Sequence, residues 1–513
     1  MLKNFSSLFS FVNRRFHYGS RRSPAAEFSD EERGIALTLS IFVLGLLFLL
    51  GMALAISAGS EIEISSSSER NVQALYIADA GINHAFDLLR GIDGDFTRVL
   101  AGADNTPGTA DDGVLSGTIY PTDAAPIPQG GLSFGNGNYS ARAYDDNDPQ
   151  VSFAPPVAPV AEDGDYSSDI NRRVVVRVTG TGPGGAQVVL DGMIGFVPYP
   201  AIASNGGLTI TGDATIQGNL GSAHSNSNLT VSGSALIEQT ATATGSYSGP
   251  PSESFNGSSG VGGFAGGDQP RIDIPDFKPI PSSTDNLPRN FFLIRSDVIL
   301  VRPNSANLNT IVTLLNLESS MSGINTSQPV IINRTVSPPT VTNAASAFGW
   351  GWNPGSGGRW ALENATTANN RTYFIDGDVR INGGNTNISV ISTESISVQG
   401  NPTINSKLND VILPRVYQPP FARINFLLLA GKDIDLQGTA SGLNLRGLIY
   451  AREQIDLRGN GFFTGQVVSF GSTHTTGSPV SSNEVSGNFT LTLNSVDGTL
   501  GKVVIISWRQ VKK

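Results

Sequence analysis

The longest hydrophobic segment of the chain covers residues 35–58, with the sequence IALTLSIFVLGLLFLLGMALAISA. It has no charged residue in 24 positions. As an α-helix rising about 1.5 Å per residue it is about 36 Å long, enough to cross the roughly 30 Å hydrocarbon core of a bilayer. No other segment of the sequence approaches that length. We therefore expect one transmembrane helix near the N-terminus.

The charges on the two sides of this segment differ in sign. The first charged residues after it are Glu61, Glu63 and Glu69. The leader before it, residues 1–34, carries the cations Lys3, Arg14, Arg15, Arg21, Arg22 and Arg33. Lys and Arg concentrate on the cytoplasmic side of a membrane, so we expect a cytoplasmic N-terminus and an outward-facing remainder. A secretory signal peptide is the competing interpretation, but its apolar region covers only about 7–15 residues.

An amphipathic pattern continues beyond the span, and residues 61–90 contain no Pro. Apolar residues recur at steps of three and four, which predicts one face of a helix. We assign this face to packing against other subunits; packing onto the chain's own next domain is the competing interpretation, and we expect it for the second half of the face. The face consists of Val72, Leu75, Ala78, Ile82, Ala85 and Leu89.

Alternating patterns between residues 91 and 200 predict a first β unit. Its strand candidates are 132–134, 139–144, 173–179 and 187–196. The segment Gly180–Gly185 between the last two formally matches the dinucleotide motif G-x-G-x-x-G. That motif requires a following helix, whereas another strand pattern follows here, so we expect a hairpin turn and an antiparallel sheet.

A short unit, apolar-polar-apolar-polar-Gly, recurs from about residue 201. Examples are Leu208–Gly212 and Leu229–Gly233, then Ile434–Gly438 and Ile455–Gly459, each pair offset by 21 residues. Repeats of about 20 residues with Gly corners are typical of a β-solenoid. We expect a parallel β-helix over residues 201–475, with a β-sandwich as the alternative. The Gly-, Ser- and Pro-rich stretch at about 245–290 predicts a loop insertion, and 476–513 predicts C-terminal strands.

Composition excludes several classes of function. The chain has 33 Lys+Arg and 43 Asp+Glu, and this net charge of −10 argues against general nucleic-acid binding. It has no Cys, which excludes disulfides, Cys-ligated metals and a thiol nucleophile. Its four His are scattered without ligand spacing. We expect no cofactor, with one exception.

The exception is an acidic loop formed by Asp145, Asp146, Asn147 and Asp148. Ca²⁺ prefers carboxylate and amide oxygens of this kind, which makes the loop a candidate calcium site. It does not match the EF-hand pattern. Solvated Asp and Asn residues that stabilise turns are the competing interpretation.

A second pair of carboxylates raises an enzymatic alternative. The 21-residue offset stacks Asp435 on Asp456 on the outer face of a solenoid, where two carboxylates can act as an acid/base pair on a polysaccharide. Outward polar residues occur on any solenoid, and no G-x-S-x-G or Ser/His/Asp grouping accompanies them. We expect no enzymatic activity.

The N-terminal region resembles the type IV pilus biogenesis proteins of the PilX type, over residues 30–90. The resemblance lies in Glu32-Arg33-Gly34, in the apolar run that starts at once, and in the segment NVQALYIADAG at residues 71–81. It implies cleavage by a prepilin peptidase between Gly34 and Ile35. Classical pilins carry Glu at the fifth mature position, where this chain has Leu39.

The resemblance and the patterns together predict a membrane-anchored, pilin-like protein of the bacterial cytoplasmic membrane. It would act in pilus assembly or as a minor or tip subunit, with an outward β domain for structure or adhesion. The implied partners are other pilin-like subunits, the assembly machinery, the lipid bilayer and a surface glycan or host or abiotic surface. The alternatives are a tethered carbohydrate-active enzyme and a solitary envelope protein.

Overall fold

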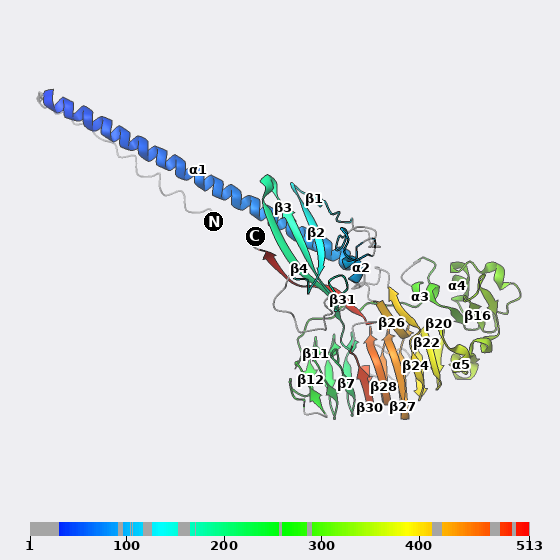
Figure 1. Cartoon of the computed structure of the whole chain (residues 1–513). Helices are drawn as coiled ribbons and strands as arrows, with labels where there is room; N and C mark the ends of the chain where they lie inside the picture. The colour runs from blue at the N-terminus through cyan, green and yellow to red at the C-terminus, as the bar shows by residue number, and fades with distance from the viewer. Residues whose placement is uncertain are drawn as a thin grey trace, which may run out of the picture. The chain divides into compact units, whose positions relative to one another are not determined.

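A computed structural model describes residues 30–90, 96–102, 104, 106–115, 126–151, 165–169, 171–255, 259–284, 290–412, 423–471, 483–494 and 499–511. The chain divides into two compact units, residues 1–70 and 71–513, and each is described by itself. Because the described residues begin at 30, most of the predicted leader, residues 1–34, lies outside them. Figure 1 shows the elements in chain order.

The first unit consists of the N-terminal part of helix α1 (Asp30–Leu89). Its apolar side chains are exposed to solvent: Phe42 is 68% exposed and Leu44 is 72% exposed. Within the described residues, α1 is the one helix that is long and apolar enough to cross a membrane. The predicted apolar span is thus helical.

The second unit begins with the end of α1 and an antiparallel sheet. Five strands of the described chain form this sheet in the order β1-β2-β3-β4-β31. The glycine-rich segment after β3 contains a short 3₁₀ turn, Pro183–Gly185, and leads into antiparallel β4, as the hairpin prediction requires. The elements are α2 (Thr97–Leu100), β1 (Leu132–Phe134), β2 (Gly137–Asp145), β3 (Arg173–Thr181), β4 (Gln187–Pro198) and β31 (Gly501–Val511).

The larger part of the second unit is a parallel β-helix, whose strands lie side by side in Figure 1. The strand pairings divide it into three faces. The first face is formed by β5 (Ile202–Ser204), β8 (Ala223–Ser225), β11 (Ala241–Ala243), β14 (Ala265–Gly266), β15 (Val298–Val301), β20 (Arg371–Asp376), β26 (Arg423–Ala430) and the ends of β22 (Asn385–Ser392), β27 (Ile434–Ala451) and β28 (Ile455–Ser469).

The second face is formed by the starts of β27 and β28 with β6 (Leu208–Ile210), β9 (Leu229–Val231), β12 (Tyr247–Ser248), β19 (Arg359–Leu362), β21 (Asp378–Ile381), β23 (Ile396–Gly400) and β29 (Asn483–Val485). The third face is formed by the middle of β27 and β28 and the start of β22 with β7 (Thr215–Gln217), β10 (Leu236–Ile237), β13 (Gly260–Val261), β24 (Thr403–Asn405) and β30 (Asn488–Thr492).

Antiparallel strands and short helices flank these coils. They are β16 (Val330–Asn333), β17 (Thr340–Thr342), β18 (Trp350–Asn353), β25 (Leu408–Ile412), α3 (Phe291–Arg295), α4 (Leu308–Leu314), α5 (Ala365–Ala368), η3 (Glu318–Met321), η4 (Ala345–Phe348) and η5 (Pro354–Ser356).

The coils do not stack in the order of the sequence. Residues 202–266 form coils on one side of β5, β6 and β7, whereas β28, β29 and β30 stack on the other side of the same three strands. The chain therefore enters the β-helix in the middle, runs to one end, crosses to the other end, and returns to the middle. The sheet strands β4 and β31 lie at the entry and exit points of this path.

Glycine forms the corners of these coils. Gly459, Gly487, Gly212 and Gly233 all have φ between +72° and +82°, a conformation that other residues rarely adopt. They follow one another across the stack: a Cβ on Gly487 would lie 2.7 Å from the carbonyl oxygen of Gly459, and one on Gly233 would lie 2.9 Å from the backbone of Gly212. The abundant glycine of the sequence thus permits close coil stacking.

The structure confirms the predicted fold class, a mainly β chain with a long N-terminal helix and a parallel β-helix. The predicted 21-residue offsets match the pairing of Leu208 with Leu229 and of Ile434 with Ile455. One expectation differs from the structure. The stretch predicted as a loop at 245–290 contains the strands β12, β13 and β14. Each has only two residues, and the Gly, Ser and Pro around them hide the alternating pattern that predicts a strand.

The predicted C-terminal strands divide between the solenoid and the antiparallel sheet. Within residues 476–513, β29 and β30 pair in parallel with β28, β6 and β7 and are part of the central coil, so the solenoid continues beyond residue 475. Only β31 joins the antiparallel sheet, next to β4. Gln466 stabilises this junction: its Nε2 donates to the carbonyls of Tyr199 and Leu500, and its Oε1 accepts from the Leu500 amide at 2.7 Å.

Candidate functional sites

The C-terminal part of α1 packs directly on the antiparallel sheet. Small residues permit a close approach: a Cβ on Gly180 of β3 would lie 2.5 Å from the backbone nitrogen of Ala78, and a Cβ on Gly81 would lie 2.6 Å from the side chain of Val178. His84 Nδ1 lies 2.7 Å from the hydroxyl of Tyr139 on β2. Helix and sheet in this unit therefore share one core.

This packing corrects the assignment of the helix face. Ala78, Ile82, Ala85 and Leu89 are buried in the chain's own core with the sheet strands, so they are not available to another subunit. Leu75 is partly buried on the same core, and Val72 is 46% exposed. The sequence pattern was correct about an apolar face, but apolar periodicity does not identify the surface that covers it.

The predicted cleavage site lies within α1. The helix begins at Asp30, so the bond between Gly34 and Ile35 is four residues inside it, and the Ile35 side chain is 70% exposed. Apolar exposure continues after the span, with Ile62 and Ile64 each 69% exposed. Exposed apolar residues of α1 thus extend from the predicted cleavage site to beyond the membrane-length segment.

The candidate calcium loop follows β2. The Asp145 carboxylate accepts a hydrogen bond from the Asp146 amide at 2.9 Å, Asp146 accepts from Asn171 at 3.0 Å, and Asp148 accepts from the Gln150 amide at 2.7 Å. The first and third of these bonds stabilise the turn locally, whereas the second joins the loop to the segment before β3. Over the described ranges, no three His, Asp or Glu side chains gather in a way that could hold a metal ion. The local bonds of Asp145 and Asp148 thus fit the turn interpretation, and Asn147 lies between them in the same loop.

The same loop borders a cavity of about 560 Å³ beside β2. A second loop, which contains Asp111 and Asp112, also lines this cavity through Asp112, and so do Arg142 and Tyr144 of β2. No sequence pattern indicates that the two acidic loops meet, because strand pairing between distant segments brings them together.

The stacked carboxylates on the second face lie in the predicted register. Asp435 pairs with Asp456, and Asp456 pairs with Glu484 of the next strand. Burial raises the pKa of Asp456 to about 6, although Arg458 opposes this through a hydrogen bond of 2.6 Å from its Nε to the Asp456 Oδ1. Arg458 Nη2 also lies 3.5 Å from Glu484. Arg458 therefore binds two of the stacked carboxylates and offsets their repulsion, which is a stabilising role on the solenoid surface.

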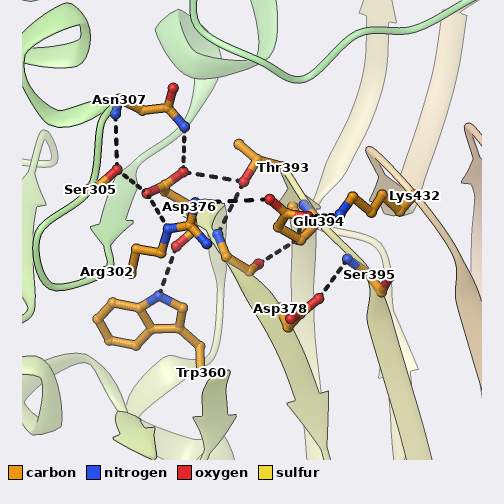
Figure 2. A network of polar contacts seen from close by, with 12 residues as sticks. Arg302, Ser305, Asn307, Trp360, Asp376, Asp378, Thr393, Glu394, Ser395 and Lys432 are labelled. Atoms are coloured by element: carbon orange, nitrogen blue, oxygen red, sulfur yellow. Dashed lines mark hydrogen bonds and ion pairs between the residues drawn. The ribbon is translucent and has the colours of Figure 1, made fainter. Parts of the chain in front are cut away.

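A polar network centred on Asp376, shown in Figure 2, corresponds to no pattern in the sequence. The Asp376 carboxylate is completely buried and accepts hydrogen bonds from Asn307 at 2.6 Å and from Ser305. Arg302 lies 3.6 Å from the same carboxylate, and the Trp360 indole donates to the Asp376 carbonyl at 3.2 Å.

Further contacts extend the network across the coils. Thr393 Oγ1 donates to Asp376 at 3.2 Å, and Lys432 lies 2.5 Å from Glu394, which is 3.9 Å from Arg302 (Figure 2). These residues come from segments about 130 positions apart, from Arg302 to Lys432. The network fixes the segment after β15 on the β-helix, which is a structural role.

The helices and strands of the described chain define the class of protein: mainly β, with a long apolar N-terminal helix, an antiparallel sheet and a β-helix. No protein-family model and no curated protein matches the chain. Among solved structures it is similar to the competence-associated pilin ComZ from Thermus thermophilus, with 15% identity and a TM-score of 0.28, over 86% of this chain and 97% of that chain. This likeness is too slight to assign a fold or a role.

Proposed function

We propose that this protein is a membrane-anchored, pilin-like subunit that inserts through residues 35–58 and associates with other pilin-like subunits through the exposed part of α1. The observation that carries the proposal is the division of α1 into two differently buried parts. Its first part exposes Phe42 and Leu44, and its last turns are buried on an antiparallel sheet.

The physical reason is the cost of exposed apolar surface. Burial of such surface contributes roughly 25 cal/mol per Å², so a long apolar helix requires a bilayer or other apolar helices around it. Ile62 and Ile64, beyond the membrane-length segment, are exposed as well. A bilayer alone leaves these two in water, whereas neighbouring helices in a filament would cover them. The N-terminal resemblance to PilX-type proteins points to the same role.

The proposed orientation is a cytoplasmic N-terminus with the sheet and β-helix outside the cytoplasmic membrane of a bacterium. In a filament, the β-helix would be displayed at the tip or the cell surface, in a structural or adhesive role. The assembly machinery and the bilayer are the other proposed partners.

Photocrosslinking in living cells tests this proposal. A photoreactive amino acid replaces Phe42 on α1, which is 68% exposed, and in a second strain replaces Phe462 on the third face, which is 62% exposed and serves as the matched control. We expect Phe42 to yield adducts with pilin-like subunits and Phe462 to yield none of them. Adducts with lipid alone from Phe42, in cells that assemble filaments, would favour a solitary envelope protein.

A further inference from the structure

The cavity beside β2 combines side chains of opposite hydrogen-bonding character. Its volume of about 560 Å³ lies within the range of roughly 300–1,000 Å³ typical of small-molecule sites. Its wall includes Asp112, Arg142, Tyr144, Asp148, Asp165 and Tyr166. Three loops and one strand therefore contribute polar and aromatic groups to a single concave surface.

Arg142 supplies the donors. Its neighbours across the sheet are already paired: Arg177 lies opposite it on β3 and binds Asp191 through two hydrogen bonds, of 2.7 and 2.9 Å. Within the described part of the chain, Arg142 has no carboxylate at ion-pair distance, and its guanidinium contacts the ring of Tyr144, 5.8 Å from the centroid. A guanidinium offers five N–H donors in a fixed plane.

Three carboxylates in the lining of the same cavity supply acceptors, and each is oriented by a hydrogen bond within its own loop. Asp112 accepts from the Gly108 amide at 2.7 Å, Asp148 from the Gln150 amide at 2.7 Å, and Asp165 from the Ser167 amide at 3.0 Å. The bonds from Ser167 lower the pKa of Asp165, so this carboxyl is ionised at neutral pH. Each ionised carboxylate has about four lone-pair positions, more than its loop uses.

A ligand for this cavity must accept from Arg142 and donate to the carboxylates. A simple anion satisfies only the arginine and is repelled by the acidic loops, and a simple cation satisfies only the acids. A hydroxyl group both donates and accepts, and a sugar ring carries several hydroxyls on adjacent carbons. Tyr144 and Tyr166 add aromatic rings, on which the C–H face of a sugar can pack.

We propose that this cavity binds a neutral mono- or disaccharide, held between Arg142 and the three carboxylates. Binding is direct and requires no metal ion. The inference goes beyond the proposed subunit role and does not depend on it, because the cavity lies entirely within the antiparallel-sheet region of one chain.

The test uses the full-length protein in a polyoxyethylene detergent, which has no sugar headgroup. Maltose, lactose, cellobiose and N,N′-diacetylchitobiose are the probes, first by saturation-transfer NMR and then by calorimetric titration. Arg142→Met and Asp148→Asn each remove one side of the site. Arg359→Met, at a half-buried arginine of β19, is the matched control, and far-UV circular dichroism verifies that all variants fold.

We expect at least one probe to bind at millimolar concentration or below. Because removal of a charged hydrogen bond typically weakens binding about tenfold or more, each cavity variant should lose at least that factor, and Arg359→Met should not change the affinity. Absence of binding by all four probes would overturn the proposal. So would equal binding by folded Arg142→Met and Asp148→Asn, or binding that disappears on addition of EDTA.

Discussion

Replacing Gly180 with Ala tests the packing of α1 on its sheet. A Cβ at this position would lie 2.5 Å from the backbone nitrogen and 2.8 Å from the Cβ of Ala78. Ordinary contact between such atoms requires about 3.5 Å or more, so the helix must retreat by about 1 Å. A gap of that size removes a quarter to a half of the dispersion energy of each contact on the buried face.

The expected cost follows from this displacement. Overpacking in a core costs typically 1–3 kcal/mol, and the upper end of about 3 kcal/mol applies here because the obstructing atoms belong to helix backbone. Since about 1.4 kcal/mol corresponds to a factor of ten, local opening of the helix–sheet core should become about 100-fold more frequent. Hydrogen exchange of the β3 and β4 amides, followed by mass spectrometry, measures this opening.

Gly130→Ala is the control, because a Cβ at Gly130 would meet no atom within 4 Å. It should leave exchange in β3 and β4 unchanged. If Gly180→Ala exchanged at the same rate as Gly130→Ala, the close packing of α1 on β3 would be wrong.

Three further predictions concern polar groups. Gln466→Leu removes the hydrogen bonds to the carbonyls of Tyr199 and Leu500 and to the Leu500 amide, which should cost about 1–3 kcal/mol. Amide hydrogen exchange near residues 199–202 and 499–503 should become faster. Unchanged exchange there would contradict the stabilising role of Gln466. Asp376→Leu leaves the donors Ser305, Asn307 and Thr393 without their acceptor and removes one of the two carboxylates near Arg302. It should destabilise that end of the β-helix by about 1–3 kcal/mol, seen as an earlier fluorescence change of the nearby Trp360 on urea unfolding. Burial raises the pKa of Asp169 to about 7 from its usual 3.8. The folded state therefore retains this proton longer than the unfolded state, and its stability should fall as pH rises from about 4 to 7. Asp169→Asn should remove that part of the dependence when Tm is compared from pH 5 to 8, and an unchanged pH slope would refute the assignment.

Local sequence patterns predicted the elements that depend on neighbouring residues. The span at 35–58 is helical because its composition and length are sufficient, and β1 begins and ends at the predicted residues 132 and 134. The 21-residue offset predicted which coils pair because each short strand places alternate residues inward, as Leu208 and Ile210 do. These inferences need only periodicity and glycine corners.

Features that depend on distant segments were not predictable in this way. The solenoid is entered at its centre, and no local pattern indicates that β28 stacks on β5. The Asp376 network joins residues that are about 70 positions apart, such as Arg302 and Asp376. The buried face of α1 shows the same limit, since Ala78 and Ile82 have equal periodicity whether they pack on a sheet or on another subunit.

The proposed function requires that this chain is processed and incorporated as a pilin-like subunit. Mass spectrometry of the N-terminal peptide, with the protein isolated from cells that have an active prepilin peptidase, tests it most directly. We expect a mature chain that begins at Ile35, and a chain that retains residues 1–34 when the peptidase is inactivated. An intact Met1 in cells with active peptidase would contradict the claim.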